Sequence, residues 1–185
     1  RPVFLGTGIV LAASLFDRTG ARWAERRRGA GWDRAGTAAS AIPIAAAAGV
    51  GLIWSGMLGD DAARTARTSA KAMALTFAAE TGLKYAVGRA RPDAGLGSAK
   101  FDPLGAGASS SAFPSRHVGL AFAAVTPFAR RYDAPWLYGL AALTGLGRIQ
   151  SREHFVSDVI AGGLIGYGIA SALYDDDQRR RAGPA

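Results

Sequence analysis

Alanine and glycine dominate the apolar residues of this chain, and this constrains its fold more than any other feature. Runs of Val, Ile, Thr and aromatic residues, which favour strands, are scarce. Small side chains instead let helices pack closely, and alanine has the highest helix propensity. At 185 residues the chain fits one domain with one core. We therefore expect an all-α fold, a single compact bundle of about six helices.

The expected helices follow apolar residues at helical spacing, separated by Gly, Pro and Asp. The segments 3–16 and 17–28 predict two short helices or one broken helix, and 37–58 is the most apolar stretch. The motif-bearing core is expected at 61–174, followed by a charged tail at 175–185 that should fray. Within that core we expect helices at 61–85, 117–131, 135–149 and 151–174, with a long polar loop at 91–114. The glycines of 162–168 lie inside an expected helix, where they indicate close packing rather than a nucleotide site.

A membrane span needs about 20 predominantly apolar residues, and only 37–58 is expected to meet this requirement. The helices expected at 117–131 and 135–149 would cover only about 20–22 Å. The mean hydropathy of +0.11 is also low for a chain whose helices nearly all lie in a membrane. These patterns favour a soluble or surface-bound domain, periplasmic or associated with the outer face of a membrane, over a fully embedded one.

The formal net charge of +8 predicts a partner that carries phosphate. Nucleic acid, an anionic membrane surface and a small phosphorylated substrate all remain open on charge alone. The absence of cysteine excludes disulfides and thiolate metal sites. Asp93 and Asp102 lack the paired spacing of a carboxylate site for Mg²⁺, so we expect neither a metal nor another cofactor.

The first of three basic clusters is KYAVGRARP, at 84–92. Lys84 and Arg91 are seven residues apart, about two helical turns, so both can face one cleft. Arg89 adds a charge that points partly elsewhere, and Pro92 ends the helix. Taken alone, such a cluster is more often a solvated helix end that complements the helix dipole.

The second cluster is FPSRH, at 113–117. Ser115 is a plausible N-cap, and a helix N-terminus presents free N–H groups that bind phosphate. This geometry would place His117 in the first turn, beside such a site. A single histidine near a cap is nevertheless more often structural.

The third cluster, GRIQSREHFVSD, contains Arg148, His154 and Asp158. On a helix, residues four apart meet, so Asp158 could accept the Nδ1–H of His154 and leave Nε2 with a free lone pair. An imidazole oriented in this way by a third group is a suitable nucleophile. The simpler alternative is a surface His–Asp pair.

The chain has only two histidines, and each lies in one of these basic clusters. Together the clusters resemble the type-2 phosphatidic acid phosphatase (PAP2) superfamily, whose signatures are K-x6-RP, PSGH and SR-x5-H-x3-D. The matching segments are 84–92, 114–117 and 147–158. Two positions depart from the signatures: Arg116 replaces a glycine and Gly147 replaces a serine.

The resemblance implies a PAP2/vanadium-haloperoxidase-like bundle and a metal-independent phosphatase acting on phosphate monoesters or diphosphates, typically lipid-linked. In such an enzyme His154 would form a phosphohistidine, His117 would protonate the leaving oxygen, and Asp158 would orient His154. The expected phosphate ligands are Lys84, Arg91, Ser115, Arg116 and Arg148. A phosphorylated small molecule or lipid and a membrane surface are then the expected partners, without nucleic acid, and the oligomeric state is left open.

Two alternatives remain at this point. A vanadium-dependent haloperoxidase would hold vanadate in the same cationic cage, although those enzymes are typically larger. A non-enzymatic basic helical module could bind anionic membrane or nucleic acid by charge, but it would not need the two histidines. Phosphate release without metal, and its loss on replacing His154, would distinguish the phosphatase from both.

Overall fold

The structure is a computed structural model that describes all residues except 1, 28, 57, 106–109 and 183–185. Its α-helices are α1 (Pro2–Ser14), α2 (Asp17–Arg26), α3 (Ala30–Ser40), α4 (Ile42–Trp54), α5 (Asp60–Val87), α6 (Arg116–Arg131), α7 (Trp136–Gln150) and α8 (Val156–Ala182), and a short 3-10 turn, η1 (Pro92–Ala94), follows α5. No strand occurs among the described residues. The all-α prediction is confirmed, although the described residues form eight α-helices where about six were expected.

The additional helices arise because the expected N-terminal helices are broken. The stretch expected as one helix at 37–58 forms α3 and α4, which meet at Ala41. Pro43 lies in the first turn of α4, where its missing N–H is harmless, but it has no N–H to continue a helix from α3. Residues 3–28 likewise form two helices, α1 and α2, in agreement with one of the two arrangements that were expected.

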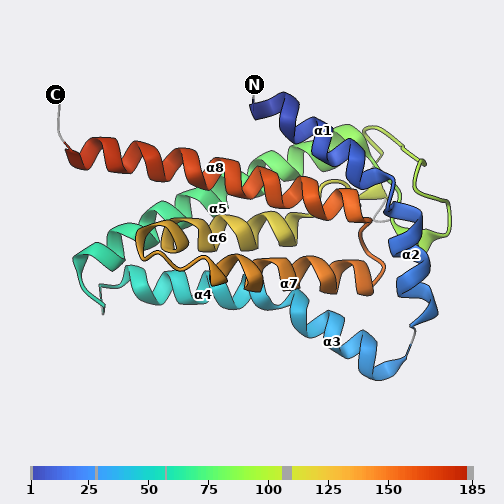
Figure 1. Cartoon of the computed structure of the whole chain (residues 1–185), viewed down its shortest axis with the longest axis horizontal. Helices are drawn as coiled ribbons and strands as arrows, with labels where there is room; N and C mark the ends of the chain where they lie inside the picture. The colour runs from blue at the N-terminus through green and yellow to red at the C-terminus, as the bar shows by residue number, and fades with distance from the viewer. Residues whose placement is uncertain (1, 28, 57, 106–109, 183–185) are drawn as a thin grey trace.

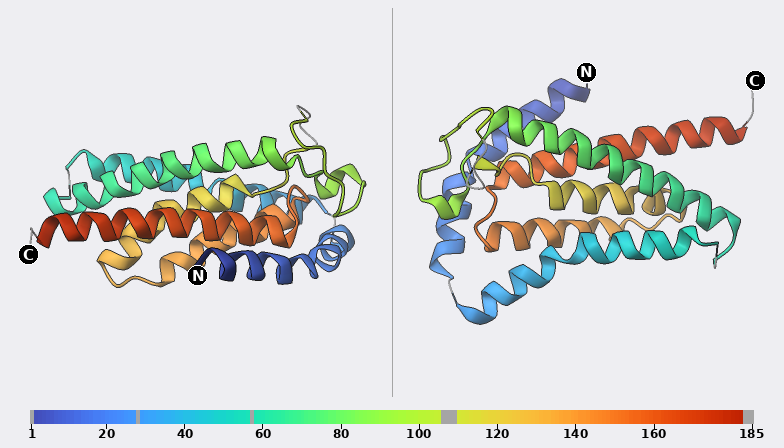
Figure 2. Two further views of the ribbon diagram at one scale, coloured as in Figure 1. Left: turned by 90° about the horizontal axis from the view of Figure 1, so that it is seen from above. Right: turned by 180° about the vertical axis from the view of Figure 1, so that it is seen from behind.

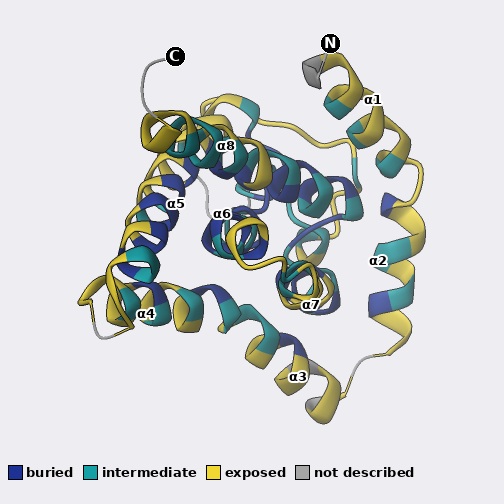
Figure 3. Cartoon of the chain, turned by 60° about the vertical axis from the view of Figure 1, so that its left-hand side comes forward, coloured by how far each residue is buried: buried dark blue, intermediate teal, exposed yellow. Residues whose placement is uncertain are grey.

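Helix α6 lies at the centre of the bundle, in contact with α4, α5, α7 and α8 (Figure 3). The two longest helices, α5 and α8, run along the bundle on either side of it (Figures 1 and 2). The core between these three helices is made of small residues, among them Ala72, Ala123 and Ala170, with Met73 and Leu173 packed against them. Small side chains here let the helix axes approach, as the alanine-rich composition predicted.

Helices α6 and α8 touch backbone to backbone at two glycines. A Cβ on Gly166 would lie 2.1 Å from the carbonyl oxygen of Gly119, and a Cβ on Gly162 would lie 2.4 Å from that of Ser115. Real Cβ atoms do not approach backbone atoms so closely, so only glycine fits at either position. The interpretation of 162–168 as a close-packing segment is confirmed.

Two helical stretches are long and apolar enough to cross a membrane: Arg34–Trp54, which joins the end of α3 to α4, and Val156–Ala182, which is α8. The prediction that only 37–58 meets this requirement is therefore wrong. It failed because the apolar part of α8, residues 156–174, is itself long enough and contains one charged side chain, Asp158. The charged tail is held in the helix by ion pairs between residues four apart, Asp176 with Arg180 and Asp177 with Arg181. The expected fraying is therefore absent up to Ala182. Residues 183–185 lie outside the described part.

Large apolar side chains are exposed around the outside of the bundle. They lie on α1, α4, α5 and α7 and include Phe4, Leu5, Leu11, Ile44, Leu52, Leu75, Phe77, Leu83, Trp136, Leu140, Leu143 and Leu146. Those on α7 recur every three or four residues and so form a stripe along one face of that helix. Exposed apolar surface of this extent marks an interaction with a membrane or a partner.

One end of the bundle collects the segments that carry the three basic clusters. The last turn of α5, the first turns of α6 and α8 and the end of α7 meet there, and α2 crosses this end (Figure 1). Gly88 ends α5 with a left-handed φ of +58°, and a Cβ at this residue would lie 1.8 Å from the carbonyl oxygen of Asp102. This turn directs the following loop back across the end of the bundle. Residues 106–109 of the loop lie outside the described part.

Candidate active site

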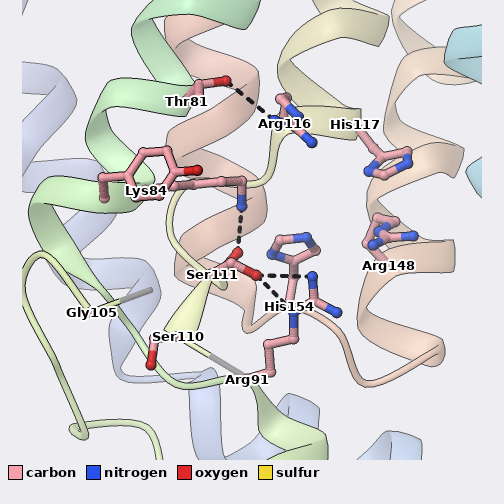
Figure 4. A pocket seen from close by; sticks show the side chains of 11 residues that line it. Thr81, Lys84, Arg91, Gly105, Ser110, Ser111, Arg116, His117, Arg148 and His154 are labelled. Carbon is pink, nitrogen blue, oxygen red and sulfur yellow. Dashed lines mark hydrogen bonds between the residues drawn. The ribbon is translucent and has the colours of Figure 1, made fainter. Parts of the chain in front are cut away.

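A cavity of about 300 Å³ opens at this end of the bundle. Its lining residues are Thr81, Lys84, Tyr85, Arg91, Gly105, Ser110, Ser111, Arg116, His117, Arg148 and His154 (Figure 4). Residues from all three basic clusters, up to 70 positions apart in sequence, therefore converge on one pocket. Two of the expected site residues, Ser115 and Asp158, do not line it.

His154 lies in the turn between α7 and α8 and is only 3% exposed. Its Nδ1 is 2.6 Å from the carbonyl oxygen of Ala112. A carbonyl can only accept, so Nδ1 carries the proton and Nε2 keeps its lone pair. Burial, together with the positive charges of Lys84 and Arg148, holds the pKa of His154 well below its usual value. The ring is therefore neutral, as a nucleophile must be.

The hydrogen bond expected between His154 and Asp158 is not made. Their closest approach, from Nδ1 to Oδ2, is 4.0 Å, and Oδ2 instead accepts the N–H of Phe155 at 2.8 Å. The expectation failed because α8 begins at Val156, so His154 is outside the helix and the geometry of residues four apart does not apply. The partner of His154 Nδ1 is the carbonyl oxygen of Ala112 instead of Asp158.

Asp158 belongs to a buried ionic network behind the pocket. Arg89 donates to Asp158 Oδ1 at 2.5 Å and to Asp17 Oδ2 at 2.7 Å. Asp17 also accepts the N–H of Ser157 at 2.8 Å and its hydroxyl at 2.7 Å. Asp17, Arg89, Ser157 and Asp158 are all buried. The network ties α2 to the first turn of α8, two residues after His154, and Arg89 points away from the pocket as its offset suggested.

Three of the lining cations are held by groups at the rim of the cavity. Lys84 donates to the carbonyl oxygen of Ser111, and Arg91 donates to its hydroxyl from Nε at 3.2 Å and Nη2 at 3.0 Å. Glu153 bridges two arginines, with Arg91 Nη1 at 3.4 Å and Arg148 Nη2 in close contact. Sequence reasoning missed Glu153 and Ser111, and no signature position points to either residue.

Ser115 takes the N-cap position of α6 but makes no side-chain cap hydrogen bond. Its hydroxyl is fully buried without a hydrogen-bond partner among the described residues, so the expected contact between this side chain and phosphate is not supported. The carbonyl of Ser115 accepts the N–H groups of Val118 and Gly119. The N–H groups of Arg116 and His117 come before Val118 in the first turn of α6. They are the N–H groups that a helix N-terminus offers to an anion.

His117 lines the cavity from the first turn of α6, on the same side as Arg148 (Figure 4). Burial, followed by the positive charge of Arg148, lowers the pKa of His117 to about 4, and Glu153 acts in the opposite direction. At this pKa the ring of His117 is neutral near pH 7. An anion bound among these cations would reverse part of this effect and raise its pKa.

Both departures from the signatures have structural consequences. Arg116 reaches into the cavity, where its Nη1 donates to Thr81 Oγ1 at 3.2 Å and its guanidinium lies 4.7 Å from the ring of Phe77. Gly147 lies against α3, where a Cβ would be 2.8 Å from the carbonyl oxygen of Gly36. A serine at this position would push α3 away, so glycine here reflects close packing between α3 and α7.

The chemistry available in the cavity is that of an anion site with a nucleophile. Cationic side chains and free N–H groups can bind the oxygens of a phosphate, His154 presents a neutral Nε2, and His117 offers a second imidazole. Among the described residues, no group of three or more His, Cys, Asp or Glu side chains is arranged to hold a metal ion. The polar groups that the cavity presents therefore suit phosphoryl transfer.

Comparisons with known proteins agree with this geometry. A family model described as the PAP2 superfamily matches residues 67–182, which include all three signature clusters. The chain is 33% identical over 106 residues to the lipid A 1-phosphatase of Porphyromonas gingivalis. That match covers 50% of this chain and 21% of the relative, so the chain spans about a fifth of the length of this curated protein.

A solved structure has the same fold. It is the crystal structure of the first transmembrane PAP2 type phosphatidylglycerolphosphate phosphatase from Bacillus subtilis. The two chains superpose with a TM-score of 0.61 over 97% of this chain and 96% of that chain, at 19% sequence identity. At this identity the similarity concerns the arrangement of the helices.

Proposed function

Because the chain belongs to the PAP2 superfamily, we propose that it is a phosphatase that hydrolyses lipid-linked phosphate monoesters or diphosphates through a phosphohistidine at His154. The observation that carries this proposal is the hydrogen bond from His154 Nδ1 to the carbonyl oxygen of Ala112. It fixes the tautomer whose Nε2 lone pair is available for attack, in a cavity lined by four cationic side chains.

In the first step, Nε2 of His154 attacks phosphorus and the bond to the leaving oxygen breaks, with its electron pair remaining on that oxygen. His117 gives the leaving oxygen a proton where the leaving group is an alcohol. A pKa of about 4 is too low for this task, but a bound phosphate dianion would offset the charges of Arg148 and Arg116 and raise it. In the second step, His117 takes a proton from water, whose oxygen attacks the phosphohistidine and releases inorganic phosphate.

Charge that develops on the phosphoryl oxygens is stabilised by Lys84, Arg91 and Arg148. The N–H groups of Arg116 and His117 add donors from the helix N-terminus. Asp158 does not contact the substrate. Together with Arg89 and Asp17 it fixes the start of α8, and this positions the turn that carries His154. Because fixed cations meet the transition-state charge, we propose that the reaction is independent of metal ions.

A lipid substrate fits the outside of the molecule. The exposed apolar side chains on α1, α4 and α7 suit contact with acyl chains, and two helices have the length and composition of membrane spans. These features favour a membrane-embedded chain over the soluble or surface-bound domain that the sequence suggested. We place the cavity end at the outer face of the membrane, as expected from the sequence.

The orientation in the membrane can be measured by labelling, because the chain contains no cysteine. Lys100→Cys introduces a thiol in the loop at the cavity end, and Arg179→Cys introduces one in the last turns of α8, at the opposite end. A membrane-impermeant maleimide applied to intact cells should label the first variant and not the second. The reverse pattern would place the cavity on the cytoplasmic side.

Phosphate release from a panel of lipid phosphates in excess EDTA tests the proposed activity. The panel contains a lipid A 1-phosphate, a phosphatidylglycerolphosphate and a prenyl diphosphate. We expect release by the parent chain and by Arg179→Gln, an exposed control, and none by His154→Asn. Equal release by His154→Asn and the parent would refute the mechanism. Bromide oxidation that requires vanadate and peroxide, without phosphate release, would instead indicate the haloperoxidase alternative.

A further inference from the structure

Arg116 gives the cavity a cation at a position where the PAP2 signature has a glycine. Its guanidinium is held in place from α5, by the hydrogen bond to Thr81 Oγ1 and by the ring of Phe77. No carboxylate is hydrogen-bonded to it in the described part of the chain. Burial, followed by the positive charge of Arg116, lowers the pKa of Lys84 to about 8. An arginine that is fixed in a cavity beside another cation is positioned for an anionic ligand.

The cavity carries more positive charge than one phosphate monoester requires. Four cations line it, and Glu153 is the acidic side chain paired with two of them, Arg91 and Arg148. Glu80 lies near Arg116 and Lys84, but its carboxyl is fully buried and neither oxygen accepts a hydrogen bond within the described residues. Burial without a partner disfavours the charged carboxylate. A ligand with one more negative charge than a monoester dianion would therefore match the cavity better.

The place of Arg116 in the cavity indicates where that additional charge would lie. Figure 4 shows Arg116 and His117 at one side of the cavity and Arg91 at the other, with His154 between them. His117 is the residue proposed to serve the leaving oxygen, so Arg116 lies on the side of the leaving group. The reacting phosphoryl group itself is met by Lys84, Arg91 and Arg148.

We propose that Arg116, held by Thr81, binds the second phosphate of a lipid diphosphate, and that the chain prefers the terminal phosphate of such diphosphates to lipid monophosphates. This inference rests on the proposed phosphatase function and specifies its substrate class. The leaving group of a diphosphate is itself a phosphate, which departs as a stable anion and needs positive charge rather than a proton. An arginine held at the leaving-group side suits this chemistry.

The proposed reaction requires no additional reactant. Nε2 of His154 attacks the terminal phosphorus, and the bond from that phosphorus to the bridging oxygen breaks. The electron pair stays on the bridging oxygen, now part of the lipid monophosphate that Arg116 binds. Water then attacks the phosphohistidine and gives a proton to His117, the bond from phosphorus to Nε2 breaks with its electron pair on Nε2, and inorganic phosphate and free His154 result.

The test compares a prenyl diphosphate with the prenyl monophosphate of the same chain length, each with the parent chain and with Arg116→Gly and Arg116→Gln. The measured quantity is kcat/KM for loss of the terminal phosphate, with the lipid products separated so that successive reactions are distinguished. We expect the parent to prefer the diphosphate by about tenfold or more, the size of a charge-assisted hydrogen bond. Both Arg116 variants should lose most or all of that preference. The control Arg67→Gln, on the exposed face of α5, should keep it.

Thr81→Val, which removes the hydrogen bond to Arg116 but not the charge, should lower the preference by a smaller factor. Inorganic pyrophosphate tests whether the lipid is needed for recognition. If the chain recognises a lipid diphosphate, pyrophosphate should be a poorer substrate than the prenyl diphosphate. Equal kcat/KM for the two would show that the diphosphate alone is recognised. Hydrolysis of both prenyl esters with the same preference in parent and Arg116 variants would overturn the inference and leave the phosphatase proposal intact. Hydrolysis of neither ester by the parent would overturn the phosphatase proposal itself.

Discussion

Replacing Asp17 by Asn tests whether α2 supports the nucleophile from outside the three signature clusters. Asp17 accepts hydrogen bonds from Arg89 at 2.7 Å and from the backbone and hydroxyl of Ser157 at 2.8 and 2.7 Å. Asn has the shape of Asp but no charge, and the NH2 group that replaces one carboxylate oxygen cannot accept from Arg89 or Ser157. The substitution therefore leaves Arg89 with Asp158 as its single carboxylate partner in the described structure.

The expected loss of stability follows from the burial of this pair, whose side chains are 6% and 1% exposed. Removing one partner of a buried ion pair typically costs about 3–5 kcal/mol. For a chain of this size, about 2–4 °C of Tm corresponds to each kcal/mol, so Tm should fall by roughly 6–20 °C. The matched control is Asp175→Asn, which breaks an exposed pair with Arg130, with side chains 48% and 33% exposed. Such pairs contribute about 0–1 kcal/mol, so its Tm should fall by no more than about 4 °C.

The assay combines thermal unfolding in detergent with steady-state kinetics well below the Tm of both variants. Because Ser157 is three residues from His154, we expect Asp17→Asn to lower kcat by about tenfold or more with little change in KM, as for a residue that positions the nucleophile. A purely structural brace would lower Tm and leave kcat of the folded protein unchanged. A Tm shift as small as that of Asp175→Asn would refute the argument that this buried network stabilises the cavity end.

Three further predictions concern packing, protonation and metal ions. Gly166→Ala should destabilise the chain by about 1–3 kcal/mol because its Cβ would lie 2.1 Å from the Gly119 carbonyl oxygen. The control Gly168→Ala, whose Cβ would have nothing within 4 Å, should be neutral or slightly stabilising. Equal Tm values for the two variants would contradict the backbone contact between α6 and α8. Vanadate should inhibit and should raise the pKa of His117 from about 4, since it offsets the charges of Arg148 and Arg116, and an NMR titration showing an unchanged pKa would contradict this. Activity should persist in EDTA, and a loss that Mg²⁺ or Zn²⁺ restores would show that the charge stabilisation comes from a metal.

The helix pattern was largely predictable from sequence because the helix ends are set by local residues. Helix α5 begins at Asp60, next to the expected Asp61, and α6 and α7 begin and end within one residue of the expected bounds. The start of α8 was placed five residues early because no Gly or Pro interrupts 151–155. The backbone instead folds back there, and the N–H groups of Glu153 and His154 both bond to the carbonyl of Arg148. That turn depends on tertiary contacts, which local patterns do not report.

The lining of the cavity was predictable to the extent that the signatures are local in sequence. Lys84, Arg91, His117, Arg148 and His154 were identified from spacing within each cluster and from the resemblance to a known family. The groups that hold these residues were missed or assigned incorrectly, because their partners are distant in sequence: Ala112 for His154, Asp17 for Arg89, and Glu153 for Arg91. An isolated Asp at the start of an amphipathic helix gives no sign that it will be buried against a residue 72 positions away.

The central claim, that His154 is the nucleophile, is tested most directly by locating the phosphoryl group during turnover. The chain is mixed with a substrate whose terminal phosphate carries ³²P, quenched within one turnover and digested, and the labelled peptide is sequenced. The account predicts an acid-labile, base-stable phosphohistidine at His154, with no label in His154→Asn. Label at His117, or turnover by the parent without any labelled protein under conditions that trap the intermediate, would contradict it.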